Sequence, residues 1–217
     1  MEPSSSNSLP DSARQYTVLR YGPAHVCQIH GPNSSVVLYT SYIASFKTKN
    51  HKYDLTLHEG ESDSGPIIGA ARLSMITNTI KLAFGDPDGS SATWEDMRNK
   101  PFTRRKQYSL SIRLPTGERR VFEWKSTHNV EALSTNPHSV ARKMEDFAYK
   151  IDSKHLKLVD QESGEVVARF IHCPLVDSCN LGKKGDVEIK RDFGGREWDK
   201  IVILSSLAIQ ESLQRGI

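Results

Sequence analysis

The last segment of the chain, from Trp198 to Leu213, most constrains the fold. Its apolar residues cover nearly the whole circumference of the helix that they would form: Ile201, Val202, Ile203, Leu204, Leu207, Ala208 and Ile209. A helix that is apolar on all sides has to be enclosed by the rest of the protein, because a surface helix keeps a polar face. The apolar run is far shorter than the roughly 20 residues that cross a bilayer, so we expect no transmembrane anchor here.

Most of the remaining chain has the pattern of short antiparallel strands, in which β-branched and aromatic runs alternate with Gly, Pro, Asn and Asp clusters. In one of them Tyr108, Leu110 and Ile112 alternate with polar residues, which predicts one buried and one exposed side. The predicted strands lie near residues 15–20, 24–30, 35–40, 42–48, 52–58, 66–73, 78–84, 106–114, 119–125, 154–160, 165–172 and 186–191.

Three segments depart from the strand pattern. Residues 1–13 are rich in Ser, Pro and Asn and are predicted to be a disordered tail. Residues 91–100 carry Trp94 and Met97 at the spacing of a single helical turn. Residues 126–150 are predicted to be an insertion loop that contains a short helix.

Strands followed by one enclosed helix predict an all-β fold, a closed antiparallel barrel of about twelve strands around the hydrophobic C-terminal helix. About eight strands already fill a barrel with their own side chains, so a wider barrel has room for a helix. Residues 14–217 would form this barrel as a single domain, since all-β domains of this length are common. The alternative is a β-sandwich that carries the helix on its open face.

The order of several short motifs resembles the tubby-like C-terminal domain in its fungal versions. The motifs are Tyr53–His58, Pro66–Gly69, Asn78–Phe84, Glu123-Trp124, Leu156–Asp160, Ser163–Phe170, Gly185–Ile189 and the final helix, and they cover residues 15–213. The resemblance implies a twelve-stranded barrel with a central C-terminal helix and no catalytic triad. It also implies a module of membrane surfaces, because tubby proteins bind phosphorylated inositol lipids through basic residues and related scramblase-type barrels act at membranes. The Lys and Arg residues of this chain do not align one by one with the tubby lipid site, and the scramblase-type membrane helix has no counterpart.

Positive charge is concentrated in one stretch, from Arg98 to Lys125. It holds nine basic residues, namely Arg98, Lys100, Arg104, Arg105, Lys106, Arg113, Arg119, Arg120 and Lys125, against Glu118 and Glu123, whereas the whole chain has a net charge of +3. This polarity predicts a positive face. If residues 106–125 form a hairpin, Lys106 lies at its open end and Arg119 lies beside its turn. The candidate lipid- or phosphate-binding residues are Arg98, Lys100, Arg104, Arg105, Lys106, Arg119 and Arg120.

This basic stretch has three interpretations. Each Lys or Arg near an anionic bilayer contributes about 1 kcal/mol of binding free energy, so several together could dock the domain on a membrane. The same charges could instead be solvated strand edges that prevent aggregation. Nucleic acid is disfavoured as a partner, because aromatic residues that would stack on bases do not interleave with the basic ones.

Motifs of catalysis, metal binding and secretion are absent from the sequence. There is no Gly-x-Ser-x-Gly, no phosphate-binding loop and no His-Glu-x-x-His, and the spacing of His25, Cys27, His30, His172, Cys173 and Cys179 does not match a zinc knuckle. We therefore expect no enzyme activity, cofactor or metal. Three cysteines form no disulfide framework and the first residues are neither basic nor apolar, which favours free thiols and a cytoplasmic location.

The predicted function is a non-enzymatic binding module, docked peripherally on phosphoinositide-containing membranes through a basic face that contacts anionic phospholipid head groups. The alternative is a soluble protein-interaction scaffold without a lipid ligand. A barrel enzyme or a carrier of small lipids is a third class, and a carrier would need a vacant interior.

Overall fold

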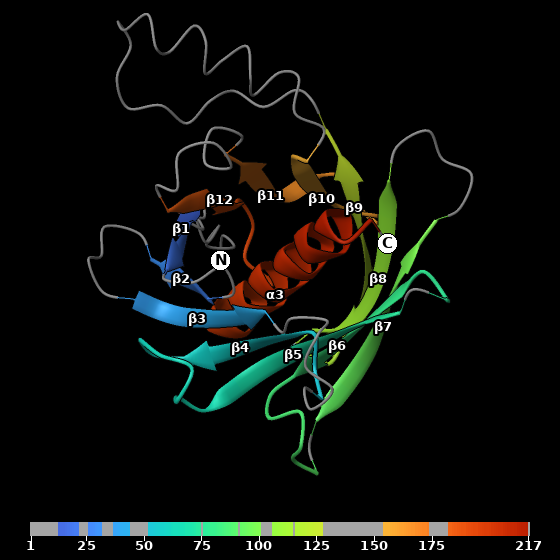
Figure 1. Ribbon diagram of the computed structural model, residues 1–217. Helices are drawn as coiled ribbons and strands as arrows, with labels where there is room; N and C mark the ends of the chain where they lie inside the picture. Colours follow the sequence, from blue (N-terminus) through green and yellow to red (C-terminus); the bar gives the residue numbers. More distant parts are fainter. Residues whose placement is uncertain are drawn as a thin grey trace, which may run out of the picture.

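The computed structural model describes residues 13–21, 26–31, 37–43, 52–74, 76–90, 92–100, 106–114, 116–127, 154–173 and 182–216, with 37–43 described by backbone alone. These residues form a mostly β structure with one C-terminal helix, as predicted (Figure 1). The predicted tail and insertion loop lie outside the described residues, apart from Ala13, Ser126 and Thr127. The strands are β1 (Arg14–Tyr21), β2 (Val26–His30), β3 (Val37–Ile43), β4 (Leu55–Glu59), β5 (Ile67–Ser74), β6 (Thr79–Phe84), β7 (Thr93–Asn99), β8 (Gln107–Arg113), β9 (Arg119–Ser126), β10 (Leu156–Asp160), β11 (Val166–His172) and β12 (Lys183–Ile189), and the helix is α3 (Gly195–Gln214).

The strands pair antiparallel in sequence order, from β2 through β12, and β1 pairs with both β2 and β12. The order of hydrogen-bonded strands thus returns to its start. Figure 1 shows the strands arranged around α3. Such a meander needs only short connections, which agrees with the turn-forming residues that separate the predicted strands.

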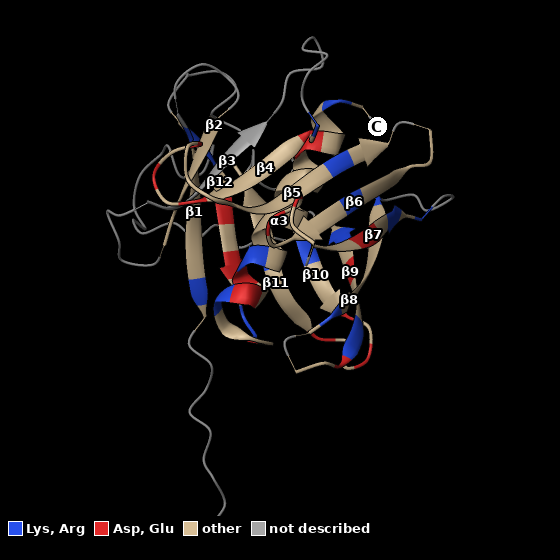
Figure 2. Cartoon of the chain, turned by 90° about the horizontal axis from the view of Figure 1, so that it is seen from below, with Lys and Arg blue, Asp and Glu red and all other residues tan. Residues whose placement is uncertain are grey.

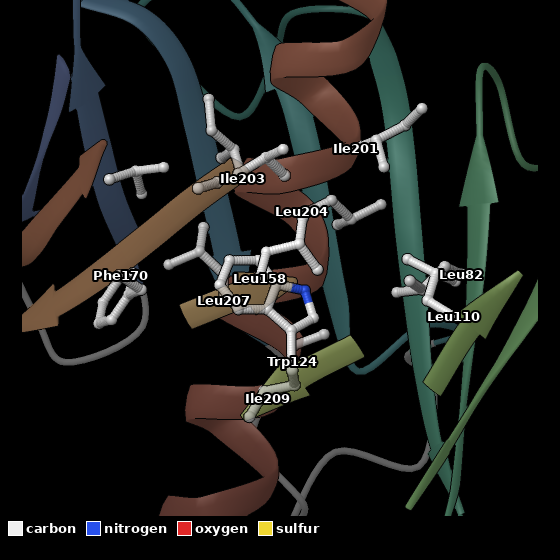
Figure 3. Packing of buried hydrophobic residues seen from close by; sticks show 14 of the residues in the cluster. Leu82, Leu110, Trp124, Leu158, Phe170, Ile201, Ile203, Leu204, Leu207 and Ile209 are labelled. Carbon is white, nitrogen blue, oxygen red and sulfur yellow. The ribbon is translucent and has the colours of Figure 1, made fainter. Parts of the chain in front are cut away.

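The helix α3 is enclosed, as its apolar circumference predicted. Its residues from Ile201 to Ser212 are all buried, and Ile203, Leu204 and Leu207 pack against side chains of the surrounding strands (Figure 3). At its N-terminus the Asp192 carboxylate accepts hydrogen bonds from the backbone N–H groups of Gly194 and Gly195, at 2.9 and 2.6 Å. These bonds satisfy N–H groups that would otherwise lack a partner at the start of a helix. Within the described residues, no helix has both the length and the apolar character needed to cross a bilayer.

Two predictions of individual elements are wrong. The helical turn predicted over residues 91–100 is strand β7, which pairs with β6 from Thr93 to Arg98. In a strand, residues three apart point to opposite sides, so Met97 enters the core while Trp94 stacks on Tyr53 outside, with ring centroids 6.0 Å apart. The separate strands predicted near 35–40 and 42–48 are not divided at residue 41, because β3 runs continuously from Val37 to Ile43.

Strand β5 approaches α3 closely at Gly69. A Cβ atom on Gly69 would lie 3.0 Å from Leu204 Cδ2 and 3.3 Å from the Ala83 carbonyl oxygen. We expect Gly69→Ala to lower the free energy of unfolding by about 1–2 kcal/mol, because the added methyl group overpacks this contact. Urea unfolding of the single variant and of the variant that also carries Leu204→Ala tests this expectation. An equal cost in both backgrounds would contradict it, because residues in contact show non-additive effects.

Candidate functional site

The basic residues of the Arg98–Lys125 stretch lie at two opposite ends of the sheet. β8 and β9 form a hairpin in which Gln107 faces Lys125 at the open end and Arg113 faces Arg119 beside the turn. The seven residues of β8 span roughly 20 Å, which separates Lys106 from Arg119. Figure 2 shows Lys and Arg both in β7 and at the β8–β9 turn. The described basic residues therefore do not form one continuous face, and Arg104 and Arg105 lie outside the described residues.

At the turn end, the two candidate arginines are engaged by carboxylates. Arg119 donates to both oxygens of the buried Glu95, at 2.8 and 3.2 Å, and also to Ser111. Arg120 pairs with Asp160, which is fully buried, and with Glu118, each at 3.3 Å. It also pairs with Glu162, and its guanidinium lies 5.1 Å from the centroid of the Phe193 ring. A buried carboxylate that loses its cation is costly, so these arginines stabilise the fold.

Four basic residues gather at the opposite end, which we call the basic rim: Arg98, Lys100, Lys106 and Lys125. Backbone hydrogen bonds hold it together, from Lys100 N to Gln107 O at 2.8 Å and from Ser126 N to Lys106 O at 3.3 Å. Within the part of the chain that the structure describes, two carboxylates take part in its ion pairs. Asp96 lies 3.7 Å from the Arg98 guanidinium, and Glu123 pairs with Lys100 and, at 2.8 Å, with Lys125. In sequence, Arg104 and Arg105 stand between Lys100 and Lys106.

Glu123 fixes the position of two of these lysines. Its side chain is almost fully buried on β9. Burial favours its neutral form, but the hydrogen bonds from the Lys100 and Lys125 ammonium groups outweigh burial and lower the pKa of Glu123. The carboxylate therefore stays ionised at neutral pH, and it holds both lysines at this end of β9.

A groove opens between β7 and β8 because the two strands pair only over a short stretch. Residues Met97–Asn99 of β7 pair with Tyr108–Leu110 of β8. Beyond those pairs the strands part, and the Arg119 side chain reaches across to Glu95. The groove has a volume of about 490 Å³ and is lined by Trp94, Glu95, Asp96, Arg98, Ser109, Ser111 and Arg119. Two arginines and two carboxylates leave it without net charge.

The His and Cys side chains of the described residues have structural surroundings. No group of three or more His, Cys, Asp or Glu side chains among them could hold a metal ion. The thiol of Cys27 is buried, and burial raises its pKa, which disfavours the reactive thiolate. The backbone N–H of His172 donates to Nδ1 of the buried His155 at 3.1 Å. This contact gives His155 a structural role between β10 and β11.

The chain was compared with known proteins in three ways. No protein-family profile matches it, and no curated protein matches it. A protein from Arabidopsis thaliana of known crystal structure aligns with 90% of this chain and 91% of its own, with 10% sequence identity and a TM-score of 0.43. A likeness at that TM-score carries no argument about fold or function.

Proposed function

We propose that this chain is a non-enzymatic binding module that docks peripherally on phosphoinositide-containing membranes through the basic rim. The observation that supports this proposal is that the basic residues fall into two groups with different surroundings. At the turn end Arg119 and Arg120 are engaged by buried carboxylates, whereas at the basic rim Lys100 and Lys125 share Glu123 and the exposed Arg98 has Asp96 only at 3.7 Å. The architecture that goes with this proposal is a closed, tubby-like barrel around α3, which the circular order of strand pairing supports.

The charge of the basic rim suits an anionic bilayer. Each Lys or Arg near such a surface contributes about 1 kcal/mol, so a cluster of bases favours reversible attachment. Arginine also offers paired donors to phosphate oxygens, and Arg98 is exposed, with its nearest carboxylate only loosely placed at 3.7 Å. Attachment of this kind weakens with salt, because mobile ions screen exposed charges.

Vesicle co-sedimentation tests the proposal. We expect the wild-type chain to bind phosphatidylcholine vesicles that contain a phosphoinositide, more tightly at low salt than at high salt. Replacing Arg98 and Lys106 together with Ala should weaken this binding roughly 30-fold, the equivalent of about 2 kcal/mol for two charges. The remaining rim residues and Arg104 and Arg105 stay in place in this variant.

A matched control removes two charges from the other end of the sheet. Arg113 is exposed at the end of β8, and Lys190 follows β12 with a carboxylate only at 3.7 Å. Replacing these two residues with Ala should leave vesicle binding near the wild-type level. If the control pair weakens binding as much as the rim pair, the net charge and not the basic rim is responsible, and the proposal fails.

The groove between β7 and β8 favours a second candidate, a protein-interaction scaffold. Its lining carries no net charge and combines serine hydroxyls with the half-buried Trp94, a composition suited to a polar peptide surface. Wild-type protein that stays in the supernatant at low salt with every phosphoinositide would exclude the membrane module and favour this scaffold.

A further inference from the structure

We infer that the β5–β6 turn, with Ile76 at its tip, inserts into the apolar boundary of the membrane that the basic rim contacts; this inference rests on the proposed function. Ile76 is 95% exposed, whereas the next most exposed large hydrophobic residue described, Val121, is 42% exposed on β9. A single exposed apolar residue is ordinary on a protein surface. The position of Ile76 in the fold distinguishes it.

Described residues on both sides of Ile76 are held by hydrogen bonds. The Ser74 hydroxyl accepts a hydrogen bond from the backbone N–H of Thr77 at 3.2 Å, and the Thr79 hydroxyl donates to the Thr77 carbonyl at 3.1 Å. Asn78 has a φ of 50°, a left-handed conformation that asparagine tolerates better than most residues. These contacts connect Ile76 to the start of β6.

The turn and the basic rim lie at the same end of the sheet. The backbone N–H of Asn99 donates to the Asn78 carbonyl at 3.1 Å, and Thr79 pairs with Arg98 across β6 and β7. The β5–β6 turn therefore lies beside the end of β7 that carries Arg98. Basic residues and an exposed apolar side chain at the same end of the sheet match the charged and apolar layers of an anionic bilayer surface. This match of charge and polarity identifies a bilayer as the occupant.

The apolar and the charged contributions can be measured separately. We expect Ile76→Ser to weaken binding to phosphoinositide-containing vesicles roughly tenfold, and by a similar factor at low and high salt, because burial of an apolar side chain is not screened by ions. Ile76→Leu should bind as the wild type does. Val121→Ser is the matched control on the outer wall and should also bind as the wild type does. The two Ile76 variants should keep the thermal stability of the wild type, since that side chain is 95% exposed.

A second readout reports insertion directly. In Ile76→Trp the new indole should be quenched by brominated lipids beyond the quenching of the wild-type chain, in which Trp124 and Trp198 are fully buried and Trp94 is half-buried. If the wild type binds and loss of Arg98 and Lys106 weakens that binding, but Ile76→Ser binds normally and the new indole is not quenched, the insertion is wrong and the proposed function stands. If the wild type binds no vesicles, both are wrong.

Discussion

Replacing Trp124 with Ala is expected to lower the free energy of unfolding by about 3–5 kcal/mol, the range for deleting a large buried aromatic side chain. Trp124 is fully buried on β9, and its ring lies among Leu158, Leu204 and Leu207 at the contact between the strands and α3 (Figure 3). The cavity left behind would have rigid strands on one side and the helix on the other, so collapse around it should be limited.

The indole also makes a polar contact with the helix. Its Nε1–H donates to Ser205 Oγ at 3.0 Å, and that hydroxyl donates in turn to the Ile201 carbonyl at 2.7 Å. In Trp124→Phe the hydroxyl keeps its own acceptor, so we expect a smaller loss of about 1–2 kcal/mol from the missing hydrogen bond and the smaller ring. Urea unfolding followed by circular dichroism measures both variants. Equal losses for Ala and Phe would show that the contact with Ser205, and not the packing of the ring, dominates.

The enclosed helix could be predicted because its signal is local. Seven apolar residues between Ile201 and Ile209 admit no exposed side, whatever surrounds them. The hairpin of β8 and β9 could also be predicted, since alternation and a glycine-containing turn are both local features. Strand β7 could not be predicted, because its sequence alternates weakly and its conformation is fixed by pairing with β6. Tertiary pairing overrode the helical spacing of Trp94 and Met97.

The same distinction applies to the candidate site. Counting charges between Arg98 and Lys125 finds only Glu118 and Glu123 as opposing acids. In the fold, Arg119 pairs with Glu95, 24 residues earlier, and Arg120 with Asp160, 40 residues later. Sequence proximity therefore overstates the positive charge at the turn end. The exposed Ile76 was missed, although Met75-Ile76 between Ser74 and Thr77 is a detectable apolar pair in a predicted turn.

Replacing Arg14 with Ala is expected to lower the free energy of unfolding by about 3 kcal/mol, because it leaves a buried carboxylate without its cation. Arg14, on β1, donates to Asp199 of α3 at 2.7 and 3.1 Å and to Asp192 at 3.0 Å. The Asp199 side chain is only 3% exposed, and the Tyr16 hydroxyl is its second donor. Arg14 thus joins the first strand to the start of the helix. Arg14→Lys should lose less, because it keeps the charge without the paired donors.

Acid titration gives an independent test of this cluster. The hydrogen bond from Arg14 is the largest cause that lowers the pKa of Asp192, from 3.8 to about 2; burial opposes it, and the N–H groups of Gly194 and Gly195 add to it. A lowered pKa in the folded state means that the ionised carboxylate contributes stability above pH 3.8, and that this contribution is lost as the pH falls toward 2. In Arg14→Ala the folded and unfolded pKa values of Asp192 should move closer together. The variant should therefore be less stable than the wild type at pH 7, and the difference between them should shrink as the pH approaches 2. A difference that stays constant from pH 7 to pH 2 would contradict the assignment, because it would show that Arg14 stabilises the fold by packing and not through these carboxylates.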